Sequence, residues 1–460
     1  MLKSTFTHSP SILYHICRMA TKCTVSVIQF TATNNKEDNF NSVKRLVGKA
    51  VDQNAKMVFL PEACDFISRD KSEFKKLSEP ISGPLIKLYQ DLAKTYGIWL
   101  SIGGFHEKFD ENTIYNSHII FDNNGDIRGI YRKIHLFDVS IPDKNIHLRE
   151  SDNNIGGAQI VPPFQSPVGQ LGLSICYDLR FPEQSTILRK LGADVLTFPS
   201  AFTSGTGKVH WEPLLKARAI ENQCYVIAAA QYGKHNEKRT SFGQSLIVDP
   251  WGQVVAECPK YSEEIDSNES IGIATIDLDL VEKVRAEMPV FYHRRNDIYS
   301  LNLIGCCQEI DDNHIYSFGD KNIPGKTVFY ISKYCYAFTN IRCVVPGHVL
   351  ISTLRVAKRL QDLSEEEISD LFQTTIKVAK VMESVHNSPS STICVQDGKF
   401  AGQTVPHVHV HVLPRKQGDF ANNDDIYLHL ARHDNERNVN ALRSQEEQIE
   451  EASILRTHFY

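Results

Sequence analysis

The chain has 460 residues, of which 42% are hydrophobic, 23% are charged and 9% are aromatic, and its net charge is −5. This length predicts two or three globular domains, each large enough for its own core. The negative charge argues against a nucleic-acid-binding surface, and no apolar run approaches the ~20 residues that a membrane-spanning helix needs. We therefore expect no nucleic acid and no membrane among the partners. The 11 cysteines lack the Cys-x-x-Cys spacing of a zinc or redox site, which indicates a reduced intracellular protein.

Residues 1–22 form a leader that differs in composition from the rest of the chain. It contains no acidic residue, and Lys3, Arg18 and Lys22 lie among serine, threonine and apolar residues. This composition is typical of a mitochondrial transit segment, although Pro10 would interrupt a helix and arginine is scarce. We expect a cytoplasmic protein, with a mitochondrial form as the alternative that this leader would provide.

From residue 23 to about residue 300, short apolar segments alternate with amphipathic ones. Strands are predicted at residues 25–30, 57–60, 119–121, 127–133, 171–175, 193–198 and 225–230, with Asn124 and Gly125 as a hairpin turn. Helices are predicted after the first strand, with Val43, Leu46, Val47, Ala50 and Val51 on one face, then between Pro84 and Gly97, from about Pro182, and at residues 211–222. This alternation predicts a layered α/β domain over residues 23–301.

Residues 302–313 interrupt the alternation and are interpreted as a linker. Beyond them, strands are predicted at residues 328–331, 334–339 and 349–353, followed by a long helix that a capping box of Ser364 and Glu367 would open. Two further strands at residues 392–395 and 407–413 precede a charged C-terminal helix. This order predicts a second, smaller α+β domain over residues 314–460.

In the first domain, three residues that could act in catalysis follow directly after predicted strands. These are Glu62, Lys133 and Cys176, and strand ends are the usual place for active groups in α/β folds. A thiol needs a base before it attacks, a carboxylate can be that base, and an ammonium can stabilise an oxyanion. Each residue alone has an ordinary alternative, because a lone cysteine is most often a small buried side chain and a lone Glu or Lys a surface charge.

The segments around these residues resemble the three catalytic blocks of the carbon–nitrogen hydrolase (nitrilase) superfamily, in the same order. They read Phe59-Leu-Pro-Glu-Ala63, Tyr131-Arg-Lys-Ile-His-Leu-Phe-Asp138 and Gly172-Leu-Ser-Ile-Cys-Tyr-Asp-Leu-Arg-Phe-Pro-Glu183. The resemblance runs from about Val25 to Leu301 and is closest to the Nit branch of ω-amidases and deaminated-glutathione amidases. It implies a four-layer αββα sandwich that hydrolyses a small amide through a thioester and needs no cofactor.

The same resemblance implies a role for each residue of this site. Cys176 would be the nucleophile, Glu62 the general base and Lys133 the group that stabilises the oxyanion. Glu150 matches a second glutamate of the branch, which would position the others. The main-chain N–H of Tyr177 would be a second oxyanion donor.

In the second domain, His407, His409 and His411 alternate with valines. Because side chains alternate along a strand, the three imidazoles are expected on one face. The residues alone leave open a metal site, a nucleophile with two supporting imidazoles, or a strand that merely carries histidines. No Asp or Glu alternates with them to orient zinc ligands, so we favour the nucleophile and expect no metal at this site. The nearby residues 396–398 and 402–404 offer amide, hydroxyl and main-chain donors that suit phosphate oxygens.

This row is the histidine triad motif, and from about Tyr316 to Tyr460 the chain resembles the Fhit branch of that family. Residues 340–350, 370–375 and 413–416 also match in order and spacing. The resemblance implies a dinucleoside polyphosphate hydrolase, typically a bis(5′-adenosyl)-triphosphatase that releases AMP and ADP. His409 would attack the α-phosphorus and form a nucleotidyl-histidine, while His407 and His348 would orient its ring.

The resemblance also implies which residues hold the nucleotide. They are Asn340, Gln396, Gly402, Gln403, Thr404, Val405 and His411. A Mg or Mn ion could accompany the triphosphate, although the chain shows no carboxylate cage for one. Lys321 is a departure, because it stands where Fhit proteins carry a histidine near the nucleotide, and this difference puts the nucleotide preference in question.

A chain with both modules in this order resembles the invertebrate fusion proteins of a Nit and a Fhit domain. Domains of each kind pair about two-fold axes, and two different two-fold contacts in one chain close into a dihedral tetramer. We therefore expect a bifunctional hydrolase that forms a homotetramer and binds diadenosine polyphosphates and a small amide. The alternative is a nucleotide-binding signalling scaffold in which one or both sites turn over slowly.

Overall fold

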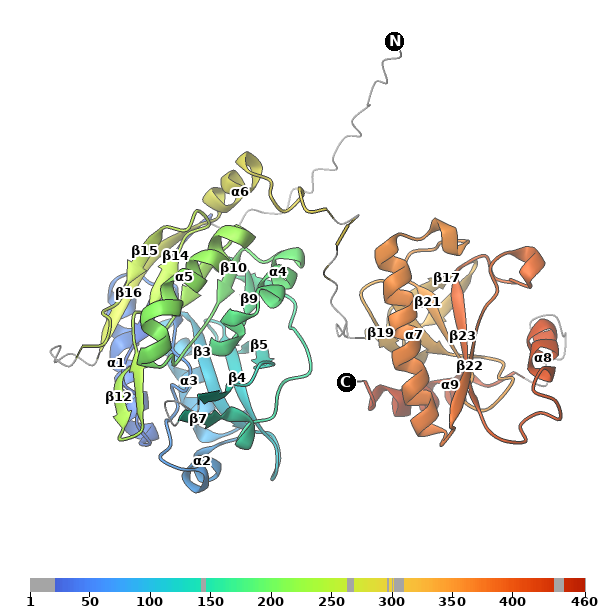
Figure 1. The fold of residues 1–460 in the computed structure, drawn as a ribbon, viewed down its shortest axis with the longest axis horizontal. Coiled ribbons are helices and arrows are strands. Elements are labelled where there is room, and N and C mark those ends of the chain that lie inside the picture. Colours follow the sequence, from blue (N-terminus) through green and yellow to red (C-terminus); the bar gives the residue numbers. More distant parts are fainter. Residues whose placement is uncertain are drawn as a thin grey trace, which may run out of the picture. The chain divides into compact units, whose positions relative to one another are not determined.

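The computed structural model describes residues 21–141, 146–262, 269–295, 298–299, 301, 310–433 and 442–459. After Leu301 the chain divides into two compact units, which Figure 1 draws in blue to yellow and in orange to red. Most of the predicted leader (residues 1–22) and linker (residues 302–313) lies outside the described residues. Lys22 nevertheless already belongs to the first strand, and Asp312 forms an ion pair of 2.8 Å with Arg456 of the second unit.

The first unit is built on two six-stranded sheets that pack face to face. One sheet has the order β16-β1-β2-β3-β4-β5, and the other has the order β15-β14-β11-β10-β9-β8. Apolar side chains from the two facing sides, among them Val27 and Phe59 of one sheet and Leu173 and Ile227 of the other, form a common buried core. This inner core explains why the central strands are apolar at nearly every position.

The strands of the first sheet are β1 (Lys22–Gln29), β2 (Met57–Phe59), β3 (Trp99–Lys108), β4 (Ile114–Phe121), β5 (Ile127–Arg132) and β16 (Ser270–Asp277). Those of the second are β8 (Phe164–Ser166), β9 (Gly169–Leu173), β10 (Val195–Thr197), β11 (Tyr225–Ala228), β14 (Leu246–Val248) and β15 (Val254–Glu257). Two hairpins stand beside the sheets, one formed by β6 (Asp138–Ile141) and β7 (Ile146–Arg149), the other by β12 (Tyr232–Asn236) and β13 (Arg239–Phe242).

Helices cover the outer faces of both sheets and complete the expected αββα sandwich. On the first sheet, α1 (Lys36–Asp52) and α3 (Pro84–Tyr96) each bury one apolar stripe, and α3 ends at Gly97 with a φ of 61°. On the second sheet lie α4 (Pro182–Lys190) and α5 (Ser204–Asn222), the latter against β11 and β14. The remaining helices are α2 (Lys71–Leu77), α6 (Leu278–Glu287) and the 3₁₀ turns η2 (Glu150–Asp152) and η3 (Cys176–Arg180).

The second unit is a five-stranded antiparallel sheet with the order β19-β20-β21-β23-β22. Its strands are β19 (Val328–Ile331), β20 (Cys335–Thr339), β21 (Val349–Thr353), β22 (Ser390–Val395) and β23 (His409–Arg415), with a separate hairpin of β17 (Ile315–Phe318) and β18 (Lys321–Pro324). Its helices are α7 (Glu365–Val385), α8 (Asp425–His433), α9 (Gln445–Arg456) and the 3₁₀ turns η4 (Gly325–Thr327), η5 (Leu360–Asp362) and η6 (Lys399–Ala401). Leu371, Val378 and Met382 of α7 share a buried core with the sheet, so this unit is the predicted α+β domain.

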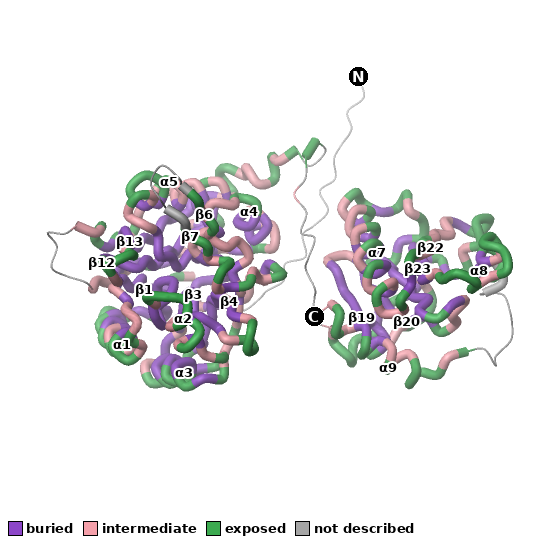
Figure 2. Tube along the Cα trace, turned by 60° about the horizontal axis from the view of Figure 1, so that its bottom comes forward, coloured by how far each residue is buried: buried purple, intermediate pink, exposed green. Residues whose placement is uncertain are grey.

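Local sequence signals located most elements well. The capping box of Ser364 and Glu367 does open α7, because each side chain accepts the other's main-chain N–H. Figure 2 shows buried segments gathered in the centre of each unit. No helix in the part of the chain that the structure describes is long and apolar enough to cross a bilayer.

Several elements differ from the sequence predictions; the strands β3, β14, β15 and β16, for example, are not predicted. The strand predicted at residues 407–413 begins at His409, and His407 lies in the bend before it. The single charged C-terminal helix is two helices, α8 and α9. The hairpin of β12 and β13 is not predicted, because charged and polar side chains occupy most of its positions and hide the alternation typical of strands.

Candidate active sites

In the first unit, Glu62, Lys133 and Cys176 meet where strands end. Glu62 lies in the loop after β2, Lys133 follows β5 directly, and Cys176 is the first residue of η3 after β9. Lys133 Nζ lies 3.0 Å from Glu62 Oε1 and 2.8 Å from Glu150 Oε2. Glu62 also shares a side-chain hydrogen bond with Cys176. The structure thus brings together four predicted site residues from distant segments.

Burial and mutual charge set the protonation of this group. Burial raises the pKa of the Cys176 thiol, and the negative charge of Glu62 raises it further, so the thiol is neutral and needs a base when it attacks. Burial would also raise the pKa of Glu62, but Lys133 and the Cys176 thiol outweigh it, lower the pKa and keep the carboxylate ionised. Burial would lower the pKa of Lys133, but Glu150 and Glu62 hold this pKa well above its usual value. A protonated thiol, an ionised carboxylate and an ammonium are the groups that general-base attack on a carbonyl needs.

Cys176 sits on a sharp turn between β9 and η3. Its φ of 46° lies in the left-handed region, which is strained for a residue with a side chain. The fully buried carboxylate of Asp178 holds the turn, since it accepts hydrogen bonds from Ile175 N–H at 2.8 Å and from Tyr131 Oη–H at 2.7 Å. His135 Nδ1 lies 2.7 Å from the other oxygen of Asp178. This carboxylate therefore ties the loop that carries Lys133 to the turn that carries the cysteine.

Tyr177 is placed where an oxyanion donor would be useful. The first hydrogen bond of η3 runs from Asp178 N–H to the carbonyl of Ile175 at 3.0 Å, so the N–H of Tyr177 has no partner within this helix. The ring of Tyr177 packs edge to face against Phe137 and Phe181. These contacts hold the main chain beside Cys176.

In the second unit, hydrogen bonds fix which nitrogen of His409 carries the proton. Its Nδ1 lies 2.7 Å from the carbonyl oxygen of His407, which can only accept, so Nδ1 carries a proton. In the neutral ring the lone pair is then on Nε2, the atom that the predicted nucleophilic role requires. The ring lies on β23, 3% exposed, with Phe318 edge to face at a centroid distance of 5.1 Å.

His407 is held from both sides, although it lies before the strand. Its Nδ1 accepts the N–H of Gly319 at 3.2 Å, and its Nε2 donates to the Arg355 carbonyl at 3.1 Å and lies 3.0 Å from Thr353 Oγ1. Burial lowers the pKa of His407, and the neighbouring His409 acts in the same direction, so the ring stays neutral. His407 therefore acts on His409 through its main-chain carbonyl, and Thr353 is a supporting residue that the sequence does not single out.

The structure places His348 beside His411. The N–H of Val344 donates to His348 Nδ1 at 3.2 Å, and His348 Nε2 lies 3.0 Å from His411 Nδ1. Because Nδ1 of His348 accepts, its Nε2 donates to His411 Nδ1, and the proton of His411 resides on Nε2. His411 thus presents a donor of the kind that a phosphate oxygen needs.

Two comparisons with known families cover both sites. Residues 24–286 match the family described as carbon-nitrogen hydrolase, and residues 321–418 match the HIT domain. The chain is 47% identical to the nitrilase and fragile histidine triad fusion protein NitFhit of Drosophila melanogaster over 433 residues. The aligned region covers 94% of this chain and 91% of that protein. The chain belongs to the NitFhit family.

A solved structure and a shorter relative agree with this assignment. The crystal structure of the Caenorhabditis elegans NitFhit protein matches with a TM-score of 0.81 and 44% identity, covering 95% of this chain and 98% of that one. The human deaminated glutathione amidase is 47% identical over 279 residues, which are 60% of this chain and 83% of that protein. The NitFhit assignment confirms both family resemblances and the presence of two hydrolase-type modules in one chain.

Asn116 is a polar contact of the first NitFhit site that the sequence does not single out. Its Nδ2 lies 2.9 Å from Glu62 Oε1 and 3.0 Å from Glu150 Oε1. The side chain is buried in β4, beside the buried polar residues Ser117 and His118. The available signal is a run of three polar residues inside a strand that is otherwise mostly apolar, where a buried polar side chain needs a partner.

Gly104 leaves room for the general base. A Cβ at this position would lie 2.5 Å from Glu62 Cγ and 2.9 Å from Glu62 Cα, and the φ of Gly104 is 66°. We expect Gly104→Ala to displace Glu62 and to lower kcat for amide hydrolysis by about 100-fold, because a displacement of ~1 Å has an effect of this order.

Gly97→Ala is the matched control for this substitution. Gly97 has a similar φ of 61°, but a Cβ there meets no atom within 4 Å. Initial rates of ammonia release, with a thermal melt of each variant, provide the measurement. An equal loss of activity in both variants would mean that backbone strain alone is responsible.

In the NitFhit triad unit, Gln403 is engaged with the main chain. Its Oε1 accepts the N–H of Gly398 at 2.9 Å, and its Nε2 donates to the carbonyls of Lys358 at 3.0 Å and His407 at 3.3 Å. Both N–H groups are used in these contacts, and the phosphate-binding role of Gln403 stays a prediction. Because the His407 carbonyl also accepts from His409 Nδ1, Gln403 helps to hold the oxygen that sets the nucleophile's tautomer.

The other predicted nucleotide-binding residues lie in two loops, after β20 and between β22 and β23. Asn340 follows β20, with its Nδ2 3.4 Å from His348 Nε2. Between β22 and β23, Gly402 has a φ of 92°, which favours glycine, and a Cβ there would lie 2.9 Å from Gln396 Nε2. In the same loop Thr404 is exposed and Val405 is buried. Lys321, which stands where Fhit proteins carry a histidine, is exposed at the start of β18.

Proposed function

We propose that the first unit hydrolyses a small ω-amide, of the kind that deaminated glutathione presents, through a thioester at Cys176. Glu62 takes the thiol proton as Sγ attacks the amide carbon, and the Lys133 ammonium with the Tyr177 N–H stabilises the oxyanion. The C–N bond then breaks, and Glu62 returns the proton to the leaving nitrogen, which departs as ammonia. Glu62 next takes a proton from the water that cleaves the thioester, so the acid leaves and the thiol is restored.

The observation that carries this proposal is the buried set of contacts between Lys133, Glu62 and Glu150 beside the Cys176 thiol. The similarity of this unit to the deaminated glutathione amidases of man and cattle, at 47% and 49% identity, supports the amide class. We propose no tightly bound cofactor for this reaction, because each proton and charge has a side chain to receive it.

For the second unit we propose cleavage of bis(5′-adenosyl) triphosphate to AMP and ADP. His409 Nε2 would attack the α-phosphorus, the bond to the bridging oxygen would break, and ADP would leave. Water would then cleave the P–N bond, which releases AMP and restores the imidazole. The observation that carries this proposal is the 2.7 Å hydrogen bond from His409 Nδ1 to the His407 carbonyl, which leaves Nε2 unprotonated. A Mg or Mn ion would arrive with the triphosphate.

Both proposals are tested on the wild-type chain with two substrates. We expect ammonia from deaminated glutathione, and AMP with ADP from diadenosine triphosphate. Nucleotide that binds in calorimetry without product formation would instead favour the signalling scaffold. A chain that releases no ammonia would contradict the first proposal and leave the second intact.

We further propose that the chain assembles as a homotetramer through one self-complementary surface on each unit. On α7, Ile368, Phe372 and Ile376 form an apolar stripe at successive helical turns, and they are 37%, 41% and 54% exposed. The helix contacts β22, which lies at the edge of its sheet and offers unpaired main-chain groups to a second copy. On α5 of the first unit, Val209 and Ile220 are also exposed, at 65% and 54%.

Phe372→Glu is expected to convert the tetramer into a dimer, because charges in the centre of a two-fold contact face each other. Light scattering after gel filtration gives the mass. Phe400→Glu is the control, since this phenylalanine is fully exposed in η6, away from the stripe. A wild-type mass of a single chain would contradict the assembly, and an unchanged tetramer in Phe372→Glu would remove α7 from it.

A further inference from the structure

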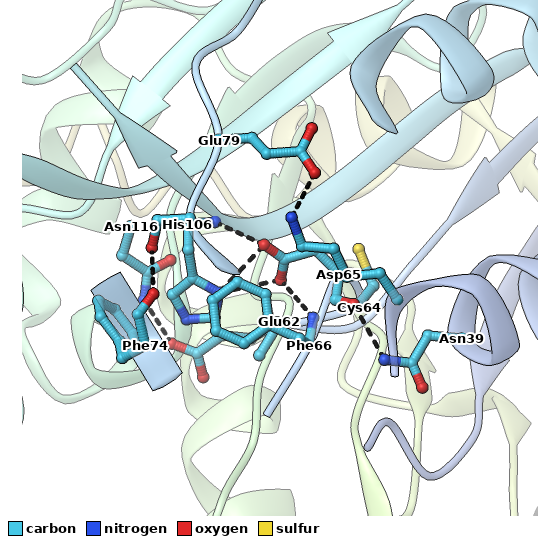
Figure 3. A network of polar contacts seen from close by, with 12 residues as sticks. Asn39, Glu62, Cys64, Asp65, Phe66, Phe74, Glu79, His106 and Asn116 are labelled. Atoms are coloured by element: carbon cyan, nitrogen blue, oxygen red, sulfur yellow. Dashed lines mark hydrogen bonds and ion pairs between the residues drawn. The ribbon is translucent and has the colours of Figure 1, made fainter. Parts of the chain in front are cut away.

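Asn116 and His106 lie opposite each other on neighbouring antiparallel strands, β4 and β3. Opposed residues of an antiparallel pair point to the same face of a sheet. Figure 3 shows both side chains directed at the loop that carries Glu62 and Asp65. The loop that carries Glu62 is therefore contacted by two cross-strand neighbours, Asn116 at Glu62 and His106 at Asp65.

Asn116 donates both of its N–H groups to catalytic carboxylates. Nδ2 lies 2.9 Å from Glu62 Oε1 and 3.0 Å from Glu150 Oε1, and Lys133 Nζ contacts the same two carboxylates at 3.0 Å and 2.8 Å. The four side chains form a closed ring in which two donors alternate with two acceptors. Because Lys133 and Asn116 occupy Oε1 of Glu62, Oε2 is the oxygen that remains for the thiol proton.

His106 holds the same loop at a second point. Its main-chain N–H donates to Asp65 Oδ2 at 2.9 Å, and its Nδ1 lies 2.9 Å from Asp65 Oδ1. The ring packs between Phe66 and Phe74, with centroid distances of 4.4 and 4.8 Å. This anchor is needed because Ala63, between the two carboxylates, has a strained φ of 57°.

We propose that Asn116 is the positioning residue that holds the carboxylates of Glu62 and Glu150 side by side and fixes which oxygen of Glu62 receives the Cys176 proton. This role rests on the proposed amide hydrolysis at Cys176. An amide suits the role because it supplies two donors without charge, whereas an aspartate would add a third carboxylate around one lysine. Asn116 Oδ1 is buried without a hydrogen-bond partner among the described residues. This arrangement is unfavourable for stability, which fits a residue that serves the reaction and not the folding of the unit.

The test measures two rates as a function of pH, kcat/KM for ammonia release and the rate of Cys176 alkylation. In each profile the rate falls at low pH as Glu62 becomes protonated, and this fall is the acid limb. The charged and titratable groups around Glu62 are Lys133, Cys176, Arg239 and, through Asn116, Glu150. Lost donors or an added negative charge raise the pKa of Glu62, so Asn116→Asp should move the acid limb of kcat/KM for ammonia release upward by about one pH unit or more.

Alkylation of Cys176 by iodoacetamide reports the same proton transfer without an amide substrate. The Sγ–C bond forms, iodide leaves and the thiol proton passes to Glu62, so its rate should show the same shifted acid limb. Peptide mass spectrometry separates Cys176 from the other cysteines. Asn116→Ser, which keeps a single donor, should shift the limb in the same direction and serves if Asn116→Asp does not fold.

Asn222→Asp is the matched control. Asn222 is also a buried asparagine of the first unit with an unpartnered Oδ1, but its Nδ2 donates to the Arg218 carbonyl at 2.9 Å and to Glu221 Oε1 at 3.4 Å, and not to Glu62 or Glu150. We expect its acid limb to stay at the wild-type pH. The proposal would be overturned if the Asn116 variants also kept the acid limb at the wild-type pH and showed only a lower melting temperature. If the wild type releases no ammonia, the alkylation profile still decides the role of Asn116.

Discussion

Cys176→Ala is expected to lower ammonia release by about 10³-fold or more, while cleavage of diadenosine triphosphate keeps its wild-type rate. The loss is large because no other group can form the thioester, and a missing nucleophile cannot be replaced by the base or the oxyanion donors. The second activity is unaffected because its nucleophile belongs to a separate compact unit. Ammonia and nucleotide products, measured on the same preparation, check both halves of this prediction.

Cys224→Ala is the matched control for that variant. Cys224 is buried in the same unit, with its Sγ 3.2 Å from the Ala193 carbonyl, and lies outside the group of Glu62, Lys133 and Cys176. It should keep amide hydrolysis within a few-fold of wild type. Equal losses from the two substitutions would show that Cys176 contributes to folding and not to the reaction.

His409→Asn is expected to lower the rate of AMP and ADP release by about 10³-fold or more, while the rate of ammonia release stays unchanged. Asparagine can still donate toward the His407 carbonyl, but it has no ring nitrogen to attack phosphorus. Nucleotide binding should survive, because the phosphate-facing donor proposed for His411 remains. Product chromatography gives the rate, and calorimetry with diadenosine triphosphate gives the affinity.

A covalent intermediate would separate this mechanism from direct attack by water. Wild-type chain denatured during turnover should carry the added mass of one adenylyl group on the peptide with His409, and His409→Asn should carry none. His386→Asn is the control, since this histidine lies in the same unit, after α7, and outside the triad. Full activity in His409→Asn would assign the reaction to another residue.

The sequence alone determined which residues are candidates for catalysis. Glu62, Lys133 and Cys176 were found because a polar residue that ends an apolar strand is a local pattern, and strand ends are where side chains leave the core. The same holds for α7, whose capping box is complete within four residues. The two family resemblances extended these local patterns to a fold and to roles.

Only the tertiary structure decided how these residues are held. Asn116 and Glu62 are in contact although they are 54 residues apart in the sequence, and Tyr131 and Asp178 although they are 47 residues apart. No local sequence pattern can therefore predict either contact. His407 leaves the strand because its ring is bound by Gly319 and Thr353, which come from other segments.

The tautomers of the triad have the same origin. The three imidazoles are equal in the sequence, whereas in the fold a carbonyl faces His409 Nδ1 and a second histidine faces His411 Nδ1, so the neutral rings differ in which nitrogen carries the proton. Strand periodicity is a property of neighbours along the chain, and it selects candidates. The direction of each hydrogen bond depends on which distant groups fold against the side chain. That direction decides which nitrogen of each histidine is a donor and which is an acceptor.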